Sequence, residues 1–141
     1  SLIQSSSLKN QEKLMIEKIN ETLELLNLSD MKNSYARELS GGQKKLLELG
    51  RSLMKSPKIL LLDEPLAGVN PKLSEQLLEI IFNLNKNGIN ILMVEHNIDA
   101  VMKISERVVV MAEGKIISDG KPDFVRSDTN VIEAYLGSSN E

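Results

Sequence analysis

Two neighbouring carboxylates, Asp63 and Glu64, follow an uninterrupted apolar run. Four aliphatic residues, at 59–62, come directly before them, and Pro65 comes after them. Such a run is typical of a strand that is buried on both faces of a parallel sheet. Ligands bind at the carboxyl ends of such strands. Two carboxylates in that place suit Mg²⁺ and a water that must be activated, so we expect chemistry there rather than packing.

Two glycines open a predicted helix over residues 41–55. Ser40 and Gln43 flank them with the spacing of a capping box, in which each side chain bonds the backbone N–H of the other. Each glycine lowers helix propensity by about 1 kcal/mol relative to alanine. A bare backbone at the positive end of a helix suits the close approach of an anion such as phosphate. Taken singly, this motif could be an ordinary loop, and the two acids an ordinary strand exit.

The only histidine, His96, follows a second predicted strand, over residues 89–94. Asp63 stands at the same end of the preceding strand, so the two strand ends could meet at one edge of a sheet. A single histidine is more often structural or exposed than functional, but the matching position favours a function here. No partner ligands with metal spacing accompany it, which argues against zinc.

Composition limits the classes of protein that the chain can represent. Its 141 residues suggest one domain, long enough for a sizeable core. Lys and Arg number 17 and Asp and Glu number 20, and the net charge of −3 argues against a nucleic-acid partner. Without cysteine, no disulfide or zinc-cysteine site is possible. No signal peptide and no apolar run near about 18 residues is present, so we expect a soluble chain without direct membrane insertion.

Helices are predicted for most of the first 57 residues. Serine-rich residues 1–7 are expected to fray, and an amphipathic helix is expected over 8–28. In the helix over 41–55, leucines form the buried side, and Lys45 is expected to face water or a partner. The segment 1–57 is therefore predicted to be a helical segment that carries the two glycines.

Strands and helices alternate over the remaining residues, 58–141, which is the α/β pattern. Asn70 is expected to cap a helix whose first residue is Pro71, and Asn87 with Gly88 is expected to end it. The predicted strands cover residues 58–63, 89–94, 107–112 and 115–118, with a hairpin turn at 113–114, and short helices cover 98–105, 123–126 and 130–136.

These motifs together make the chain resemble the C-terminal half of an ABC-type ATPase. Residues 59–64 resemble the Walker B strand with its catalytic glutamate. The residues that resemble the signature motif are Leu39, Ser40, Gly41, Gly42 and Gln43. The resemblance covers about residues 13–137. It implies a partial ABC-ATPase sheet, related to the P-loop NTPases, with flanking helices. No Gly-x-x-x-x-Gly-Lys stretch occurs in the 141 residues, so the P-loop strand and the N-terminal part are absent from this chain.

The resemblance implies a role for each candidate residue, with ATP and Mg²⁺ as cofactors. Asp63 would be the Mg²⁺ ligand, through a water, and Glu64 the general base on the attacking water. His96 would contact the γ-phosphate. The signature residues 39–43 would bind the ATP that is held by the opposing subunit of a dimer.

Residues 66–71 resemble the D-loop of the family. Asn70 stands where family members often carry aspartate, so it keeps the helix cap but lacks the charge. That departure leaves its role in the dimer open, although it belongs to the candidate nucleotide-binding residues. The segments 67–71, 94–96 and 131–137 most resemble the ATP-binding subunit of a branched-chain amino acid importer.

That likeness implies a second nucleotide-binding subunit and transmembrane permease subunits as partners, and a cytoplasmic position, peripheral on the inner face of the membrane. Two alternatives stay open. The chain could be the C-terminal ATPase half of a chromosome-structure or DNA-repair ABC protein, although the helix before the signature is short for that class. It could also be a non-catalytic interaction module. Because the P-loop is absent, we expect the isolated chain to be inactive and to expose an apolar edge that invites self-association.

Overall fold

The computed structural model describes the backbone of residues 2–136 and the side chains of residues 7–135. The chain divides into two compact units, unit 1 over residues 1–94 and unit 2 over residues 95–141. In each unit, helices accompany a small sheet, which is the α/β class that the sequence predicts. The sequence predicted a boundary at residue 57 between two segments of one domain. That boundary differs from the division between these two units, and it stays a prediction.

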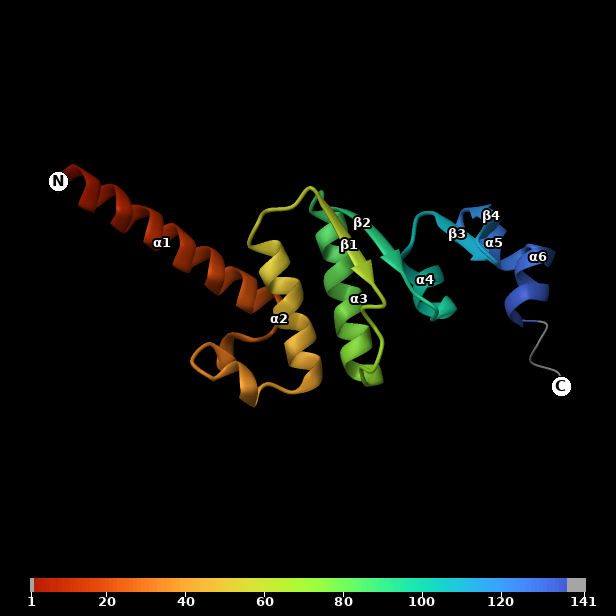
Figure 1. Cartoon of the computed structure of the whole chain (residues 1–141), viewed down its shortest axis with the longest axis horizontal. Helices are drawn as coiled ribbons and strands as arrows, with labels where there is room; N and C mark the ends of the chain where they lie inside the picture. The colour runs from red at the N-terminus through yellow and green to blue at the C-terminus, as the bar shows by residue number, and fades with distance from the viewer. Residues whose placement is uncertain (1, 137–141) are drawn as a thin grey trace. The chain divides into compact units, whose positions relative to one another are not determined.

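Unit 1 begins with one long helix, α1 (Leu2–Leu25), which runs through the serine-rich residues (Figure 1). The prediction that residues 1–7 fray is therefore wrong from residue 2 onward, and Ser1 lies outside the described residues. Serine is only a moderately poor helix former, and a helix that has nucleated adds a hydrogen bond with each further residue. Asn27, with a φ of 54°, ends the helix in the left-handed conformation.

Two short 3₁₀ turns, η1 (Ser29–Met31) and η2 (Ala36–Glu38), lead from α1 into α2 (Gly41–Leu53). The end of α1 packs closely on α2, because a Cβ placed on Gly50 would lie 2.6 Å from Cδ1 of Leu26. Leu26 is fully buried there. The core of unit 1 is made largely of leucines, namely Leu26, Leu28, Leu39, Leu46, Leu49, Leu53, Leu60, Leu66, Leu77, Leu78 and Leu84.

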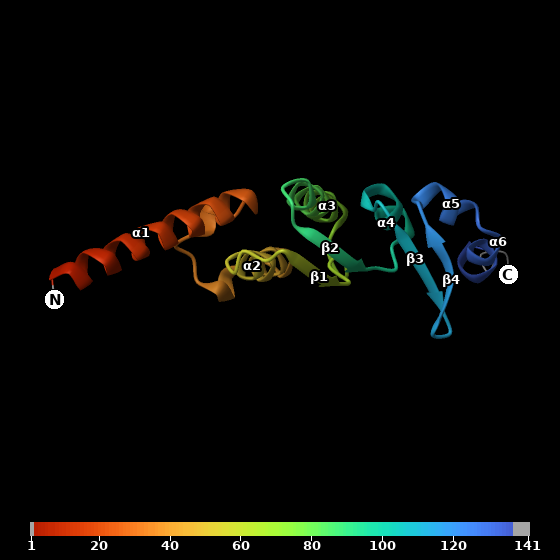
Figure 2. The ribbon, with the colours of Figure 1, turned by 90° about the horizontal axis from the view of Figure 1, so that it is seen from above.

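The sheet of unit 1 consists of β1 (Ile59–Asp63) and β2 (Asn90–Val94), which pair in parallel. The crossover between them is α3 (Pro71–Lys86), and it runs alongside both strands in the two views (Figures 1 and 2). The helix ends as predicted, with Gly88 at a φ of 93°. Strand, helix and strand thus form one βαβ unit, which brings the carboxyl ends of β1 and β2 side by side.

The two faces of this sheet differ in burial, which corrects the prediction of a strand buried on both sides. Leu60 is 6% exposed, whereas its neighbour Leu61, on the opposite face, is 71% exposed. Ile59, Leu92 and Val94 share the face of Leu61 and are also exposed. The helices of unit 1 cover only the face of Leu60, so the unit presents a sheet face of aliphatic side chains.

Unit 2 is built on an antiparallel hairpin of β3 (Val108–Ala112) and β4 (Lys115–Gly120), with a bulge after Val110. Glu113 and Gly114 form its turn with φ values of 49° and 75°, as the predicted two-residue turn requires. The helical elements of this unit are α4 (Ile98–Ile104), α5 (Pro122–Ser127), α6 (Thr129–Val131) and the π-helical turn η3 (Ile132–Leu136).

The core of unit 2 is small: Val108, Val125 and Val131 are buried together, and four partly buried residues pack against them, namely Val101, Met102, Val110 and Ile117. Polar contacts surround it: Ser118 Oγ donates to Asp128 Oδ2 at 2.7 Å, and the hydroxyl of Tyr135 donates to the carbonyl of Met111 at 2.6 Å. In neither unit does a helix within residues 2–136 combine the length and the apolar character needed to cross a membrane.

Candidate functional site

The two acids predicted to do chemistry lie where β1 ends. Asp63 is the last residue of β1 and pairs with Val94, the last residue of β2. The N–H of Glu64 donates to the carbonyl of Val94 at 2.9 Å and so continues the ladder by one residue. Both acids are exposed, and the alternation of the strand places Asp63 on the aliphatic open face of the sheet. The carboxyl end of a parallel strand is the expected place for a ligand.

The backbone of Glu64 is strained. Its φ is 44°, in the left-handed region that glutamate rarely adopts. The carbonyl of Glu64 accepts from the N–H of Ala67 at 3.1 Å, and the N–H of Val69 donates to Leu66 at 3.3 Å, so the chain turns sharply as it leaves the strand. A conformation of this kind costs on the order of 1–3 kcal/mol and is typical of functional sites. The sequence carried no signal for it.

The predicted capping box at the start of α2 is confirmed. Ser40 Oγ accepts from the N–H of Gln43 at 3.2 Å, and Gln43 Oε1 accepts from the N–H of Ser40 at 2.8 Å. An α-helix leaves its first N–H groups without partners inside the helix. The cap uses that of Gln43, so those of Gly41 and Gly42 remain for a ligand.

The two glycines of this turn serve different purposes. A Cβ on Gly42 would lie 1.9 Å from Cδ2 of Leu73, so Gly42 allows α2 to pack on the first turn of α3. A Cβ on Gly41 would meet no atom within 4 Å, so packing does not explain this glycine. Open space at Gly41 agrees with close approach by an anion. Leu39 is 8% exposed and packs in the core, which leaves its backbone as the part that could touch a nucleotide.

Lys45, which the sequence predicts to face water or a partner, points inward instead. Its ammonium donates to the carbonyl of Pro65 at 3.4 Å and to the carbonyl of Ala67. Lys45 is half-buried, and these bonds join α2 to the loop that follows the two acids. The sequence pattern carried no signal for this contact, because the two carbonyls lie 20 and 22 residues further along the chain.

Asn70 caps α3 as predicted. Its Oδ1 accepts from the N–H of Leu73 at 3.0 Å, and Pro71 occupies the first helical position. The side chain of Asn70 is thus engaged within its own chain. Any contact with a nucleotide or a second subunit would have to share or replace this bond.

His96 belongs to unit 2, whereas Asp63 and Glu64 belong to unit 1. Its side chain is exposed, and its N–H donates to Oε2 of Glu95 at 3.2 Å. Asn97, the next residue, caps α4 by accepting from the N–H of Ala100 at 3.1 Å. The predicted meeting of His96 with the two acids stays a prediction.

The acids at the end of β1 fit Mg²⁺, although they do not form a metal cage. Among the residues that the structure describes, no group of three or more His, Cys, Asp or Glu side chains could hold a metal ion. Mg²⁺ is usually held by one or two carboxylates, with waters and substrate phosphates as its other ligands. Asp63 and Glu64 supply hard oxygen donors in the exposed position that this coordination needs.

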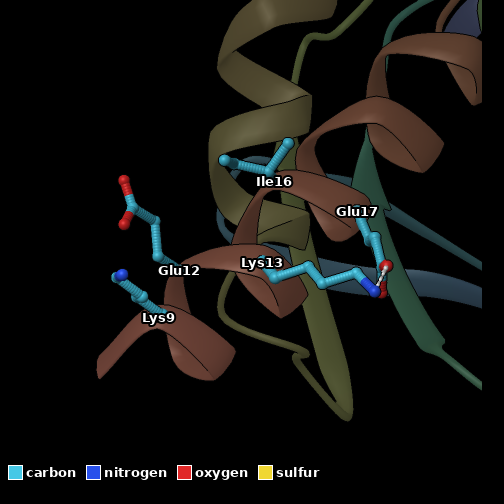
Figure 3. Close-up of a pocket in the computed structure, with 5 residues that line it drawn as sticks. All are labelled: Lys9, Glu12, Lys13, Ile16 and Glu17. Atoms are coloured by element: carbon cyan, nitrogen blue, oxygen red, sulfur yellow. Dashed lines mark ion pairs between the residues drawn. The ribbon is translucent and has the colours of Figure 1, made fainter. Parts of the chain in front are cut away.

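A hollow on the surface of α1 lies apart from all of these residues in the sequence. Figure 3 shows its lining, which is formed by Lys9, Glu12, Lys13, Ile16 and Glu17 of a single helix. One weak ion pair, Lys13 to Glu17 at 3.9 Å, crosses it, and both side chains are more than half exposed. A groove between the side chains of one helix offers no convergent polar groups, so we do not assign it a function.

Two family models match the chain. Residues 2–67 match the model described as ABC transporter, and residues 115–140 match the model described as branched-chain amino acid ATP-binding cassette transporter. The first match contains both acids and the signature turn, which comprises the signature residues 39–43 at the start of α2. The second begins at β4, so it covers none of the candidate catalytic residues.

Curated relatives agree with these matches. The probable branched-chain amino acid transport ATP-binding protein LivG of Archaeoglobus fulgidus is 44% identical over 133 residues, which is 94% of this chain and 51% of that protein. The lipopolysaccharide export system ATP-binding protein LptB of Haemophilus influenzae is 37% identical over 121 residues, 86% of this chain and 50% of that protein. The chain therefore spans about half the length of the curated relatives it matches.

A solved structure confirms the fold class. The crystal structure of the ADP conformation of an ATP-binding cassette of an ABC transporter superposes with a TM-score of 0.78 at 42% sequence identity. The match covers 87% of this chain and 50% of that one. At this identity, the likeness of fold and the likeness of sequence support one another.

Proposed function

Because this chain belongs to the ABC transporter family of ATP-binding proteins, we propose that it serves the hydrolysis of ATP that drives an importer of branched-chain amino acids. One observation carries the proposal. Glu64 holds a strained backbone directly after Asp63, at the carboxyl end of a parallel strand, where a ligand is expected.

Glu64 acts in this proposal as the general base. A carboxylate oxygen of Glu64 accepts the proton of the water that attacks the γ-phosphate. Phosphoryl transfer depends chiefly on positioning and on electrostatic stabilisation. The strained turn supports such a role, because bonds to Val94 and from Ala67 fix the main chain of Glu64 and so limit where its carboxylate can lie.

Asp63 and His96 complete the chemistry on this chain. Asp63 would hold Mg²⁺, and the ion, when bound, would neutralise charge on the phosphates. The imidazole of His96 donates a hydrogen bond to an oxygen of the γ-phosphate. Its place just after β2, the neighbour of β1, supports this role.

The signature turn serves a second copy of the site. In the proposed dimer, the N–H groups of Gly41 and Gly42 and the positive end of α2 bind a phosphate of the ATP that the opposing subunit holds. Open space at Gly41 supports this contact. The opposing subunit supplies the P-loop for that ATP, and transmembrane permease subunits receive the resulting motion.

The cargo assignment rests on a different part of the chain from the catalytic assignment. Relatives named for branched-chain amino acid transport and for lipopolysaccharide export both exceed one third identity, so identity alone separates the two cargoes poorly. The match at residues 115–140 favours branched-chain amino acids. This proposal also places the protein on the inner face of the membrane, against its permease.

The test is Glu64→Gln in the longest natural product of the gene, because the 141 residues contain no P-loop. The expected result is a loss of turnover of about 10²–10⁴-fold with ATP binding retained, since only proton transfer is removed. Glu79→Gln is the matched control, an exposed glutamate on α3, and it should leave turnover unchanged. Turnover that survives Glu64→Gln would refute the role. The isolated 141-residue chain should show no turnover.

A further inference from the structure

We propose that Lys45 is a positioning residue. Its hydrogen bonds hold the loop after Glu64 against α2, the signature helix, which begins with the signature glycines. Phosphate contact at the start of α2 and the placing of the Glu64 carboxylate are then linked through one side chain. The catalytic consequence rests on the proposed function, whereas the structural link does not.

The first step is the pair of bonds that Lys45 makes. Its ammonium donates to the carbonyls of Pro65 and Ala67, which lie on the two sides of Leu66. Leu66 is 7% exposed, so the side chain between the two carbonyls points into the core. Hydrogen bonds from a charged donor are stronger than neutral ones. Loss of Lys45 would leave two carbonyls of a tight loop without this partner.

The second step is that the same face of α2 holds the loop at a second point. Gly42 stands one turn before Lys45, and positions three apart lie on one face of a helix. A Cβ on Gly42 would lie 1.9 Å from Leu73 Cδ2 and 3.7 Å from Val69 Cγ1. The signature helix therefore approaches both the loop and the first turn of α3, and Lys45 adds the polar part of this attachment.

The third step connects Lys45 to the main chain of Glu64. Lys45 donates to the carbonyl of Ala67, and the N–H of Ala67 donates to the carbonyl of Glu64 at 3.1 Å. The N–H of Glu64 in turn donates to Val94 at 2.9 Å. A continuous path of hydrogen bonds thus runs from α2 through the loop to the sheet. These hydrogen bonds can hold Glu64 at its strained φ of 44°, because a strained conformation persists only where its surroundings hold it.

Hydrogen exchange on the longest natural product of the gene tests the link. Lys45→Met keeps the length of the side chain and removes its donors, so the N–H of Ala67 should exchange at least about tenfold faster. Lys45→Arg, which can still donate to both carbonyls, should restore most of the protection. Lys44→Met is the matched control, an exposed lysine on the same turn, and it should change nothing.

Protection within α2, at Leu49 and Leu53, shows whether each variant is folded. Unchanged exchange at Ala67 in a folded Lys45→Met variant would overturn the link. If Lys45→Met loses the protection of α2, Lys45→Ala, which also has no side-chain donor, takes its place under the same criteria.

Kinetics of the longest natural product separate this inference from the proposed function. Lys45→Met should lower kcat for ATP by about 10–100-fold with little change in KM, because a displaced base spoils the reaction geometry rather than binding. Lys45→Arg should recover part of that loss. If Glu64→Gln abolishes turnover while Lys45→Met leaves kcat unchanged, the inference fails alone. If Glu64→Gln has no effect, the proposed function fails, and the exchange result still decides the link.

Discussion

The two units of this chain are stabilised in different ways. Unit 1 buries long aliphatic side chains from α2, β1, α3 and the segment that follows α1. Unit 2 packs three valines together and adds hydrogen bonds between charged and polar side chains. One of these is the bidentate contact of Arg107 with Asp119, at 2.7 and 2.6 Å across the hairpin. The unit with the signature residues and both acids therefore has the larger apolar core, whereas the unit with His96 combines a smaller apolar core with polar contacts around its hairpin.

The largest expected effect on stability comes from replacing one of two neighbouring leucines of β1 by alanine. Leu60→Ala should lower the free energy of unfolding of unit 1 by about 2–5 kcal/mol, because it empties part of a buried site. Leu61→Ala, one residue along the strand, should change it by less than about 0.5 kcal/mol, because Leu61 is 71% exposed. Urea unfolding followed by far-ultraviolet circular dichroism measures both. Equal losses for the two variants would mean that the open face of the sheet is covered in solution.

Removal of the α3 cap should have a moderate effect on unit 1. Asn70→Ala loses the bond from Asn70 Oδ1 to the N–H of Leu73, which typically costs about 1 kcal/mol. Asn70→Asp keeps an acceptor and adds negative charge at a positive helix end, so it should retain the stability. The same unfolding measurement compares the two variants. A loss in Asn70→Asp equal to that in Asn70→Ala would show that the cap is not what stabilises the start of α3.

Local signals in the sequence predicted most of the elements of this fold. Ser40 with Gln43, and Asn70 with Pro71, marked two helix starts correctly, because a cap is made by residues a few positions apart. The turn at 113–114 was equally readable, since Gly114 readily accepts the positive φ that a two-residue hairpin needs. Asp63 was placed at the end of its strand for a similar reason, as a polar residue that ends an apolar run.

Features that depend on distant partners could not be read in this way. Lys45 looked like a solvent-facing lysine, and only the fold brings the carbonyls of Pro65 and Ala67 to its ammonium. The run at 59–62 predicted burial on both faces, but what covers a strand is decided by other segments. The sequence pattern also assigned Gly41 and Gly42 the same role, the close approach of an anion. The position of Leu73 shows that Gly42, unlike Gly41, is needed for packing on α3.

Protonation of one carboxylate should give the smallest effect, and it concerns unit 2. A hydrogen bond from Ser118 is the main cause that lowers the pKa of Asp128, and the N–H of Asn130 adds to it. A lowered pKa in the folded state means that ionised Asp128 stabilises unit 2. That contribution is present above the unfolded pKa of about 3.9 and is lost as the pH falls through the lower folded value.

Asp128→Asn should therefore weaken unit 2 slightly at neutral pH and make no difference once Asp128 is protonated in the folded wild type. Titration of the Asp128 carboxyl carbon by NMR measures the folded pKa, and exchange of the β4 amides follows stability. Ser118→Ala should move the pKa of Asp128 back towards its ordinary value, because it removes the main donor. If the pKa of Asp128 is the same in Ser118→Ala and in the wild type, the bond between the two side chains does not hold the hairpin to α6. Unit 2 would then depend on its apolar core and on its remaining polar contacts, such as that of Arg107 with Asp119, and the contrast with unit 1 would be weaker.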